Sequence, residues 1–334
     1  MEEYYYQLIA HYFNKSINSE ELQQLKYWVE RNEANQRKFR EVLRIFEAAE
    51  RYGQQPASQA KSWALVANHI SQSAANEKPK PKIKKLGGWH RYAMAAMVVM
   101  VCGAGLLLLK SDRAKTRQQT IVKVISNPNG EQRSITMPDG SVVYLNAGSR
   151  MSYNAHFSAD KREVKLEGEA FFDVVHETRR PFVVRTGKVS TTVLGTSFNI
   201  KAFPAKAVEV TVETGKVGVV LQRANKKDTL NFLLPNEQLL IDATTEKIVK
   251  QNINATAVSG WKQYKLVFYN VPMQDIAASI ERAYDVKISF KQPKTAQLKL
   301  TAKFDKCGIK QVMEVLSKLA GTHYDIKQNN ITIY

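Results

Sequence analysis

In the stretch REVKLEGEAFFDV, residues 162–174, small or apolar residues alternate with residues that are mostly charged. One parity holds Val164, Leu166, Gly168, Ala170, Phe172 and Val174. A period of two is typical of a β-strand with one buried face. Similar patterns extend from Thr120 to about Gln251, so we predict an all-β domain over residues 118–251.

Two turn signals support this domain. The tripeptide Pro138-Asp139-Gly140 has turn chemistry, because proline presets φ and glycine tolerates a positive φ. Farther along, the valine-rich segments 208–212 and 217–221 mirror each other across Thr214 and Gly215. This second pattern predicts a β-hairpin.

The C-terminal segment contains an internal repeat with an offset of 36 residues, which places Phe268 on Phe304 and Ile276 on Val312. Each copy has the pattern of strand, helix and strand, with helices expected at 273–284 and 309–320. The two βαβ repeats predict an α+β domain over residues 262–334, with helices packed on one sheet.

The N-terminal segment, residues 1–77, has the apolar spacing of helices. Three helices are expected around Leu8, Leu25 and Val42, and a fourth over 63–70. Asn18 and Glu21 have the spacing of a capping box before the second helix. This pattern predicts a small all-α module with a marginal core, part of whose apolar surface is completed by a partner.

Between these regions, the run AMAAMVVMVCGAGLLLL at residues 93–109 contains no charged residue. Counted from Trp89, a helix here would be about 31 Å long, close to the hydrocarbon thickness of a bilayer. We therefore predict one transmembrane helix at 93–109, preceded by a basic tether at 78–92. Basic residues flank both sides, so charge alone favours a cytoplasmic N-terminus only faintly.

The composition narrows the possible functions. The net charge is +18, but residues 1–77 carry nine basic against ten acidic side chains, and elsewhere the excess is mostly spread thinly. Nucleic-acid binders usually concentrate their positive charge, so we expect no direct binding to nucleic acid. Two distant cysteines and six scattered histidines indicate neither a disulfide framework nor a metal site.

We find no sequence pattern for catalysis or cofactor binding. Phosphate-binding loops, metalloprotease motifs and nucleophile turns are absent from the sequence. Glu167 and Glu169 are two residues apart on one expected strand and resemble a carboxylate pair for glycan hydrolysis. A solvated strand face explains them better, so we expect that the protein is not an enzyme.

Several separated motifs resemble those of the FecR family of membrane-anchored sigma-factor regulators. They include residues 137–147 (MPDGSVVYLNA), the segment 162–172, residues 193–200 (VLGTSFNI) and residues 234–238 (LPNEQ). The family-motif positions, mostly structural, are Pro138, Asp139, Gly140, Gly168, Glu169, Gly195, Thr196, Phe198 and Asn199. Trp28, Asn35 and Phe39 are similar to an N-terminal signature, and residues 261–273 resemble a C-terminal domain related to the secretin/TonB short N-terminal fold.

The resemblance implies an inner-membrane protein with a cytoplasmic N-terminus and a periplasmic C-terminus. Its N-terminal module would bind an extracytoplasmic-function sigma factor. The periplasmic part would receive a signal from the signalling domain of an outer-membrane TonB-dependent transporter. The tentative sigma-binding residues are Leu22, Leu25, Trp28, Phe39, Val42 and Phe46.

Two questions stay open at this level. The module could inhibit the sigma factor or be required for its activity, and release could follow a change of association or proteolysis. An alternative function is a membrane-anchored periplasmic protein that binds glycans or remodels the cell wall.

Overall fold

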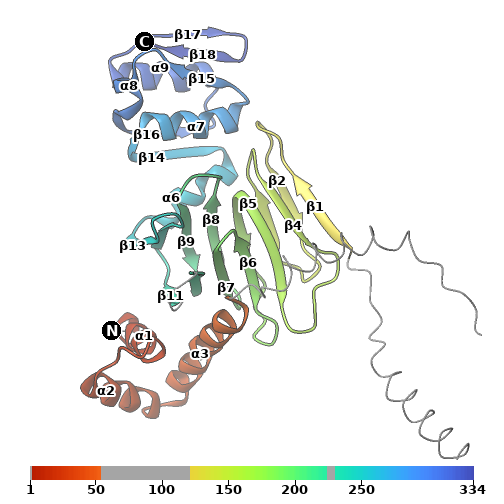
Figure 1. The fold of residues 1–334 in the computed structure, drawn as a ribbon, viewed down its shortest axis with the longest axis vertical. Helices are drawn as coiled ribbons and strands as arrows, with labels where there is room; N and C mark the ends of the chain where they lie inside the picture. Colours follow the sequence, from red (N-terminus) through yellow and green to blue (C-terminus); the bar gives the residue numbers. More distant parts are fainter. Residues whose placement is uncertain (1, 54–120, 224–229) are drawn as a thin grey trace, which may run out of the picture. The chain divides into compact units, whose positions relative to one another are not determined.

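A computed structural model of the protein describes residues 2–53, 121–223 and 230–334 (Figure 1). The predicted fourth helix at 63–70, the basic tether at 78–92 and the predicted membrane helix at 93–109 lie outside the described residues.

Residues 2–53 form three helices, α1 (Glu2–Phe13), α2 (Ser19–Glu30) and α3 (Glu33–Gly53). The capping box predicted at the start of α2 is confirmed: the Asn18 side chain accepts from the Glu21 backbone N–H, and the Glu21 carboxylate accepts from the Asn18 N–H. These bonds satisfy backbone donors that a helix N-terminus leaves without partners.

Residues 121–252 form the predicted all-β domain. Its strands are β1 (Val122–Ser126), β2 (Arg133–Thr136), β3 (Val142–Leu145), β4 (Arg150–Asn154), β5 (Arg162–Asp173), β6 (Phe182–Thr186), β7 (Val189–Val193), β8 (Ser197–Ala202), β9 (Val208–Thr214), β10 (Val217–Leu221), β11 (Leu230–Leu233), β12 (Glu237–Asp242) and β13 (Lys247–Asn252). They form one continuous sheet of 13 strands.

β5, which covers residues 162–173 of the quoted stretch, belongs to both halves of this sheet. Its first half pairs with β4 and β6, and its second half pairs with β3 and β8. The change of partners occurs around Gly168, whose φ is +105°. A side chain at this position would be strained, and a Cβ there would lie 2.7 Å from the Cα of Ser149. Glycine therefore lets one strand serve both halves of the curled sheet.

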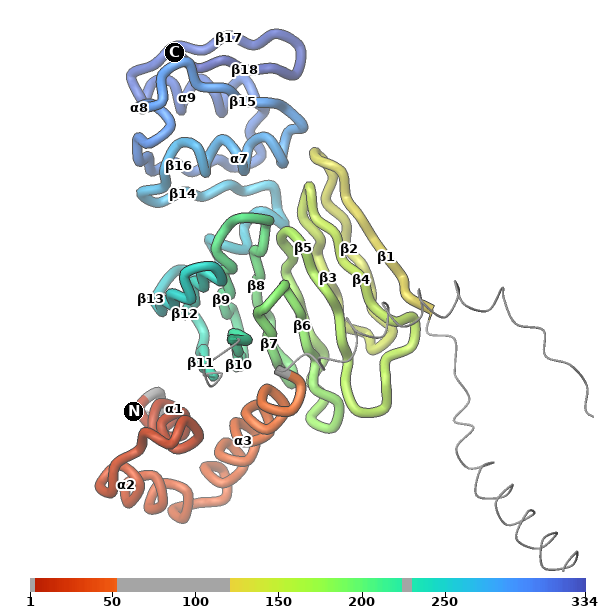
Figure 2. Tube along the Cα trace, in the orientation of Figure 1, coloured from red at the N-terminus to blue at the C-terminus, as the bar shows by residue number. Residues whose placement is uncertain are grey.

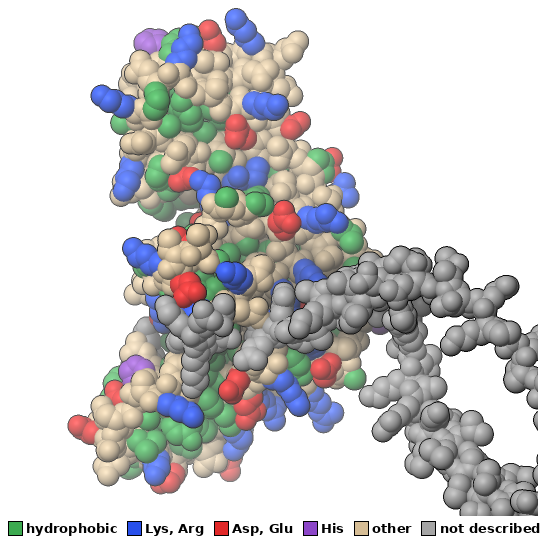
Figure 3. All heavy atoms as spheres, viewed as in Figure 1, with side chains coloured by type: hydrophobic (Ala, Val, Ile, Leu, Met, Phe, Trp, Pro, Cys, Tyr) green, Lys and Arg blue, Asp and Glu red, His purple; other side chains and the backbone are tan. Residues whose placement is uncertain are grey.

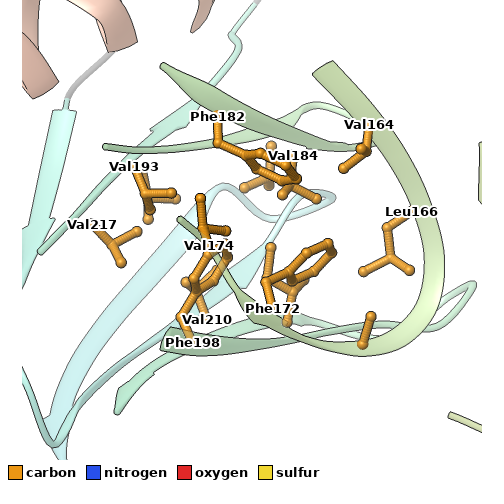
Figure 4. Packing of buried hydrophobic residues seen from close by; sticks show 14 of the residues in the cluster. Val164, Leu166, Phe172, Val174, Phe182, Val184, Val193, Phe198, Val210 and Val217 are labelled. Carbon is orange, nitrogen blue, oxygen red and sulfur yellow. The ribbon is translucent and has the colours of Figure 1, made fainter. Parts of the chain in front are cut away.

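The two halves of the sheet enclose a core of valine, leucine and phenylalanine side chains (Figure 4). The alternating residues of β5 supply much of it, as the sequence pattern predicts. Phe172 of β5 stacks on Phe198 of β8, with ring centroids 5.1 Å apart and an interplanar angle of 16°. Both rings are fully buried, so this pair fastens β5 to its neighbour through the core.

The predicted hairpin between residues 208 and 221 was wrong. β9 pairs with β8 and β12, whereas β10 pairs with β7 and β11. At Gly215, with φ +84°, the chain passes from one half of the sheet to the other instead of folding back on itself. Both strands carry buried aliphatic residues at every second position, a pattern that indicates strands but does not say which neighbour each one pairs with.

After β13, the short helices α6 (Ala255–Val258) and η1 (Ser259–Gln263) lead into the C-terminal domain. This domain contains β14 (Lys265–Pro272), α7 (Met273–Tyr284), β15 (Lys287–Phe290), α8 (Pro293–Gln297), β16 (Lys299–Asp305), α9 (Ile309–Ala320), β17 (Tyr324–Lys327) and β18 (Asn330–Ile333). The bounds of α7 and α9 are those that the repeat predicts.

The prediction of a single sheet in this domain needs correction. The strands form two small sheets, β14-β16 and β15-β18-β17, which Figure 2 shows as separate runs of the tube. One apolar cluster, with residues from both sheets and from α7 and α9, joins them. Each repeat therefore contributes one strand to the two-stranded ribbon and one to the three-stranded sheet.

The predicted fold class also needs correction in its membrane helix. Within residues 2–53, 121–223 and 230–334, no helix combines the length and the apolar character needed to cross a membrane. The described chain thus consists of an all-α module, an all-β domain and an α+β domain. The domain boundaries proposed from the sequence stay predictions.

Candidate functional site

The Pro138-Asp139-Gly140 turn carries the first of two buried polar centres. The Gly140 N–H donates to the Met137 carbonyl at 3.0 Å, and Gly140 has a φ of +84°, so the turn chemistry predicted from the sequence is confirmed. The turn places the Asp139 carboxylate 2.7 Å from a guanidinium nitrogen of Arg162, the first residue of β5.

Arg162 is fully buried and hydrogen-bonded in several directions. Beyond Asp139, its guanidinium donates to the carbonyls of Arg180 at 2.8 Å, Val175 at 2.9 Å and Leu194 at 3.3 Å. A buried charge needs such partners to offset its loss of hydration. Arg162 therefore joins the 138–140 turn, β5 and the segment before Gly195 into one unit.

The Gly195-Thr196 pair allows backbone segments to approach closely. A Cβ on Gly195 would lie 2.5 Å from the Cα of His176. The Thr196 hydroxyl donates to the Lys216 carbonyl at 2.9 Å, and the Lys216 N–H donates back to it at 3.3 Å. These contacts hold the passage from β9 to β10, so the two motif residues act in folding.

The second polar centre surrounds Glu169. Its carboxylate accepts from the amides of Asn146 at 2.9 Å and Asn199 at 3.0 Å. The Asn199 carbonyl oxygen in turn accepts from the indole N–H of Trp261 at 3.0 Å. Because Trp261 lies in η1, this chain of hydrogen bonds connects three strand-associated motif residues with the entry to the C-terminal domain.

This geometry corrects the interpretation of the two glutamates as a solvated face. Glu167 is exposed, whereas Glu169 is only 8% exposed. The positive φ of Gly168 between them interrupts the regular alternation. Both oxygens of Glu169 accept amide hydrogens, an arrangement that positions neighbouring groups rather than offering a free base.

A cleft of about 360 Å³ adjoins this network. Its lining includes Asn146, Glu169, Trp261 and, from α7, Arg282. Burial lowers the pKa of Arg282, and nearby carboxylates including Glu169 oppose that shift. Amide, acidic and basic groups thus border the cleft together, which suits contact between the β domain and the C-terminal domain.

Five of the six predicted sigma-binding residues belong to one apolar cluster of the helical module, and Leu22 is the exception. Leu25, Trp28, Val42 and Phe46 are buried there, and Leu22 and Phe39 are half-buried. Trp28 stacks on Tyr5 with ring centroids 4.8 Å apart. The five residues of the cluster therefore serve the packing of the helices, and the role of all six in binding a sigma factor stays a prediction.

The same cluster includes two residues of the β domain, Leu194 and Phe232. Phe46 stacks on Phe232 at 5.6 Å, and Glu41 of α3 pairs with Lys216 at 2.9 Å. One side of α3 therefore presents an apolar face that accepts aromatic and aliphatic side chains from outside the module.

Sequence reasoning missed three exposed tyrosines on the helices. Tyr27 is 70% exposed, Tyr12 45% and Tyr4 44%. Exposed aromatics are frequent in protein interfaces, because they combine a large apolar area with a polar end. The signal was present in the helical spacing: Tyr27 lies beside Trp28 and therefore faces a different direction.

Sequence reasoning also passed over Arg162 and Trp261 as centres of polar networks. Both residues belong to the motif segments, but nothing in their sequence context indicates which residues they bond. Their partners lie up to 62 positions away along the chain. Only the folded sheet brings them together.

Comparison with known proteins agrees with this description. Residues 123–218 match the model of the family described as FecR protein, and residues 265–333 match that of FecR, C-terminal. No curated protein matches the chain.

Two crystal structures, each of a "putative anti-sigma factor" from Parabacteroides distasonis, are similar to this chain at 35% identity and a TM-score of 0.59. The matches cover 64% of this chain and 98% and 99% of the two solved chains. With both family models matched and this identity spanning nearly the whole of the solved chains, the protein belongs to the FecR family.

Proposed function

We propose that the protein regulates a sigma factor. In this proposal, its N-terminal helices bind an extracytoplasmic-function sigma factor, and its remaining domains receive a signal from the periplasmic signalling domain of an outer-membrane TonB-dependent transporter. The observation that carries the proposal is the match of both FecR models, together with the 35% identity to proteins described as anti-sigma factors.

The helical module is suited to binding a protein. Its core consists of a few aromatic and aliphatic residues, and small cores of this kind gain stability from a partner. The exposed Tyr27 offers contact area on the module. Amphipathic helices that cover the surfaces used by RNA polymerase would keep the sigma factor from transcription.

The distribution of charge fits a protein partner better than a nucleic acid. On the face shown in Figure 3, lysine and arginine side chains are scattered among acidic and apolar ones. A nucleic-acid interface would gather them along one groove or helix.

The first experiment separates binding from folding. Tyr27→Ala removes an exposed ring, so we expect it to weaken capture of an extracytoplasmic-function sigma factor from the same organism while leaving helicity unchanged. Trp28→Ala removes a buried ring stacked on Tyr5 and should lower helicity and capture together. Binding is measured by calorimetry with the full chain, and helicity by circular dichroism.

If Tyr27→Ala binds like the wild type, Tyr27 is outside the interface. If neither the wild type nor any variant binds the sigma factor, the proposed function is wrong. A reporter gene driven by the sigma factor then shows whether the protein inhibits or activates it. Deletion of the chain raises transcription if the protein is an inhibitor and lowers it if the protein is a required activator.

We also propose the inner-membrane localisation, with the N-terminus in the cytoplasm and the C-terminus in the periplasm. This localisation would separate α3 from the β domain. The contact between α3 and β10 would then be open in the cell, and the α3 face covered by Leu194 and Phe232 would be free for the sigma factor.

A cysteine pair tests this arrangement. A Cβ at position 218 would lie 3.6 Å from the Cβ of Ala49, within the roughly 3.5–4.5 Å that disulfides require. With both native cysteines replaced by serine, Ala49→Cys/Gly218→Cys should form no disulfide in intact cells treated with an oxidant. Complete disulfide formation in cells would contradict the localisation.

A further inference from the structure

The strand β1 forms one border of the 13-stranded sheet (Figure 1). Within residues 121–223 and 230–334 it pairs with β4 alone, and its five residues follow one register without a bulge. Aliphatic side chains are exposed along it: Ile121 is 62% exposed, Val122 55% and Val124 51%. A straight, apolar edge of this kind is a template for pairing with another strand.

The other borders of the sheet are better protected. Helices α1 and α3 contact β11. On β13, the exposed Val249 lies between Lys247 and Lys250, and β2 is a four-residue strand that begins with Arg133. Proteins use cover, charge and shortness to keep edge strands from pairing with other chains. By this comparison, β1 is the border most open to a further strand.

The backbone of β1 shows which hydrogen-bonding groups are directed to its open edge. Backbone hydrogen bonds at Ile121 and Asn127, which flank β1, join it to the residues that flank β4. Hydrogen-bonded residues alternate in an antiparallel pair, so the odd-numbered residues of β1 bond to β4. The N–H and C=O groups of Val122, Val124 and Ser126 therefore point to the open edge. These residues are placed symmetrically about Val124, so an identical antiparallel strand can bond to all three.

The side chains of β1 also match those of a second, antiparallel β1. In this pairing, Val124 lies opposite Val124 of the second copy, Val122 opposite Ser126, and Lys123 opposite Ile125. Directly opposed positions thus never carry two like charges, and the central pair joins two half-exposed valines. The strand is complementary to itself in both its backbone and its side chains.

We propose that β1 is a self-association edge, on which two copies of the chain join their sheets by antiparallel pairing centred on Val124. The inference goes beyond the proposed function, because it concerns contact between two copies of this chain and requires neither a sigma factor nor a transporter. One pair of five-residue strands is small beside the roughly 1,200–2,000 Å² that stable interfaces bury. The dimer should therefore exchange with the monomer.

Disulfide trapping of the purified full chain tests this pairing, with Cys102 and Cys307 replaced by serine. Opposed hydrogen-bonded residues in an antiparallel pair have Cα atoms about 5.5 Å apart, a separation that a disulfide spans. Val124→Cys should therefore cross-link to itself under mild oxidation and give a covalent dimer. Because the Val124 side chain is half exposed, the variant should keep the circular dichroism of the wild type.

Val122→Cys is the matched control, since Val122 is exposed to nearly the same extent as Val124. In the proposed register, the two copies of position 122 are four residues apart along the strand, roughly 14 Å, which is too far for a disulfide. Val122→Cys alone should therefore give little dimer. Mixed with a Ser126→Cys chain, it should give a cross-linked dimer of the two variants.

Two results of the trapping experiment would overturn the proposal. Equal dimer yields from Val124→Cys and Val122→Cys would indicate random collision or another register, and no covalent dimer from Val124→Cys would exclude the pairing. The same variant oxidised in cells tests the competing occupant. A cross-link there to a different protein, with none between two copies, would assign the edge to that protein and contradict self-association.

Sedimentation over a range of concentrations tests the same edge without cysteines. The wild type should show a monomer–dimer equilibrium. Val124→Lys places two ammonium groups opposite each other at the centre of the pairing, so we expect its dissociation constant to rise at least ~10-fold. A Val124→Lys chain that dimerises like the wild type would show that the contact lies elsewhere and would overturn the proposal.

Discussion

The β domain and the helical module bury their signature residues by different physical means. In the β domain, Arg162 and Glu169 are buried charges whose hydrogen-bonding groups each meet a specific partner. In the helical module, aromatic rings such as Trp28 and Tyr5 stack on one another. Directional bonds fix one arrangement, whereas apolar contacts tolerate repacking against another surface. This difference fits the proposed roles of the two regions, in which the β domain stays rigid and the helical module adapts to a partner.

Breaking the buried ion pair should have the largest effect. Arg162→Met leaves the Asp139 carboxylate buried without its cation, so we expect the opening free energy of β5 to fall by about 3–5 kcal/mol. Hydrogen exchange of β5 amides measures it. Arg180→Met, which breaks the partly exposed pair with Glu177, is the control and should change the opening free energy little. Equal losses in the two variants would show that the buried ion pair stabilises β5 no more than the partly exposed pair does.

Adding a methyl group at the bend of β5 should come next. Gly168→Ala forces a positive φ on alanine and places its Cβ 2.4 Å from the Ser149 hydroxyl oxygen, so we expect a loss of about 2–3 kcal/mol. In the control Gly187→Ala, φ is +58° but the Cβ has no neighbour within 4 Å, so the loss should be about 1 kcal/mol. Denaturant unfolding compares the two. A tolerated Gly168→Ala would show that β5 does not need this bend.

Removing one hydrogen bond from the Trp261 network should have a moderate effect. Trp261→Phe deletes the indole donor to Asn199 and should cost about 1–2 kcal/mol, with faster proteolysis at residues 255–263. Trp28→Phe keeps a ring beside Tyr5, so the loss in this control should be below about 1 kcal/mol. Unchanged proteolysis of Trp261→Phe would mean that the network does not hold η1 in place.

Titration of Glu163 should give the smallest effect. Burial alone would raise the pKa of this carboxyl, but the hydrogen bond from Lys161 and the charge of Arg185 outweigh it and lower the pKa below its ordinary value of 4.5. The stabilisation is therefore present above about pH 4.5 and is lost as the pH falls through the folded-state pKa. Glu163→Gln should flatten that acid limb in pH-dependent unfolding. If the stability of Glu163→Gln falls at low pH as it does in the wild type, groups other than Glu163 cause the pH dependence.

The sequence predicts well whatever depends on neighbours along the chain. The capping box at Asn18, the turn at Gly140 and the bounds of α7 and α9 follow from local spacing and chemistry. Strand pairs and hydrogen-bond partners that lie far apart in the chain do not follow from local spacing. The sequence does not show that β9 and β10 pair with other strands, because an alternating row of aliphatic residues fits several neighbouring strands equally well.

Some features of the candidate site also follow from the sequence, and others depend on the folded backbone. Glycine at 168 and 195 was identified as a motif residue from the sequence, and the close approaches around both positions explain why side chains are excluded there. The burial of Glu169 could not be predicted, because the alternation that places it beside Glu167 is broken by the backbone of Gly168.

The most direct test of the central claim is binding between the purified full chain and the extracytoplasmic-function sigma factors of the same organism. The account predicts a stable complex that disappears when residues 2–53 are deleted, while a chain with Val249→Ser still forms it. A complex that survives the deletion undiminished, or a wild-type chain that forms none, would contradict the assignment of sigma-factor binding to the N-terminal helices.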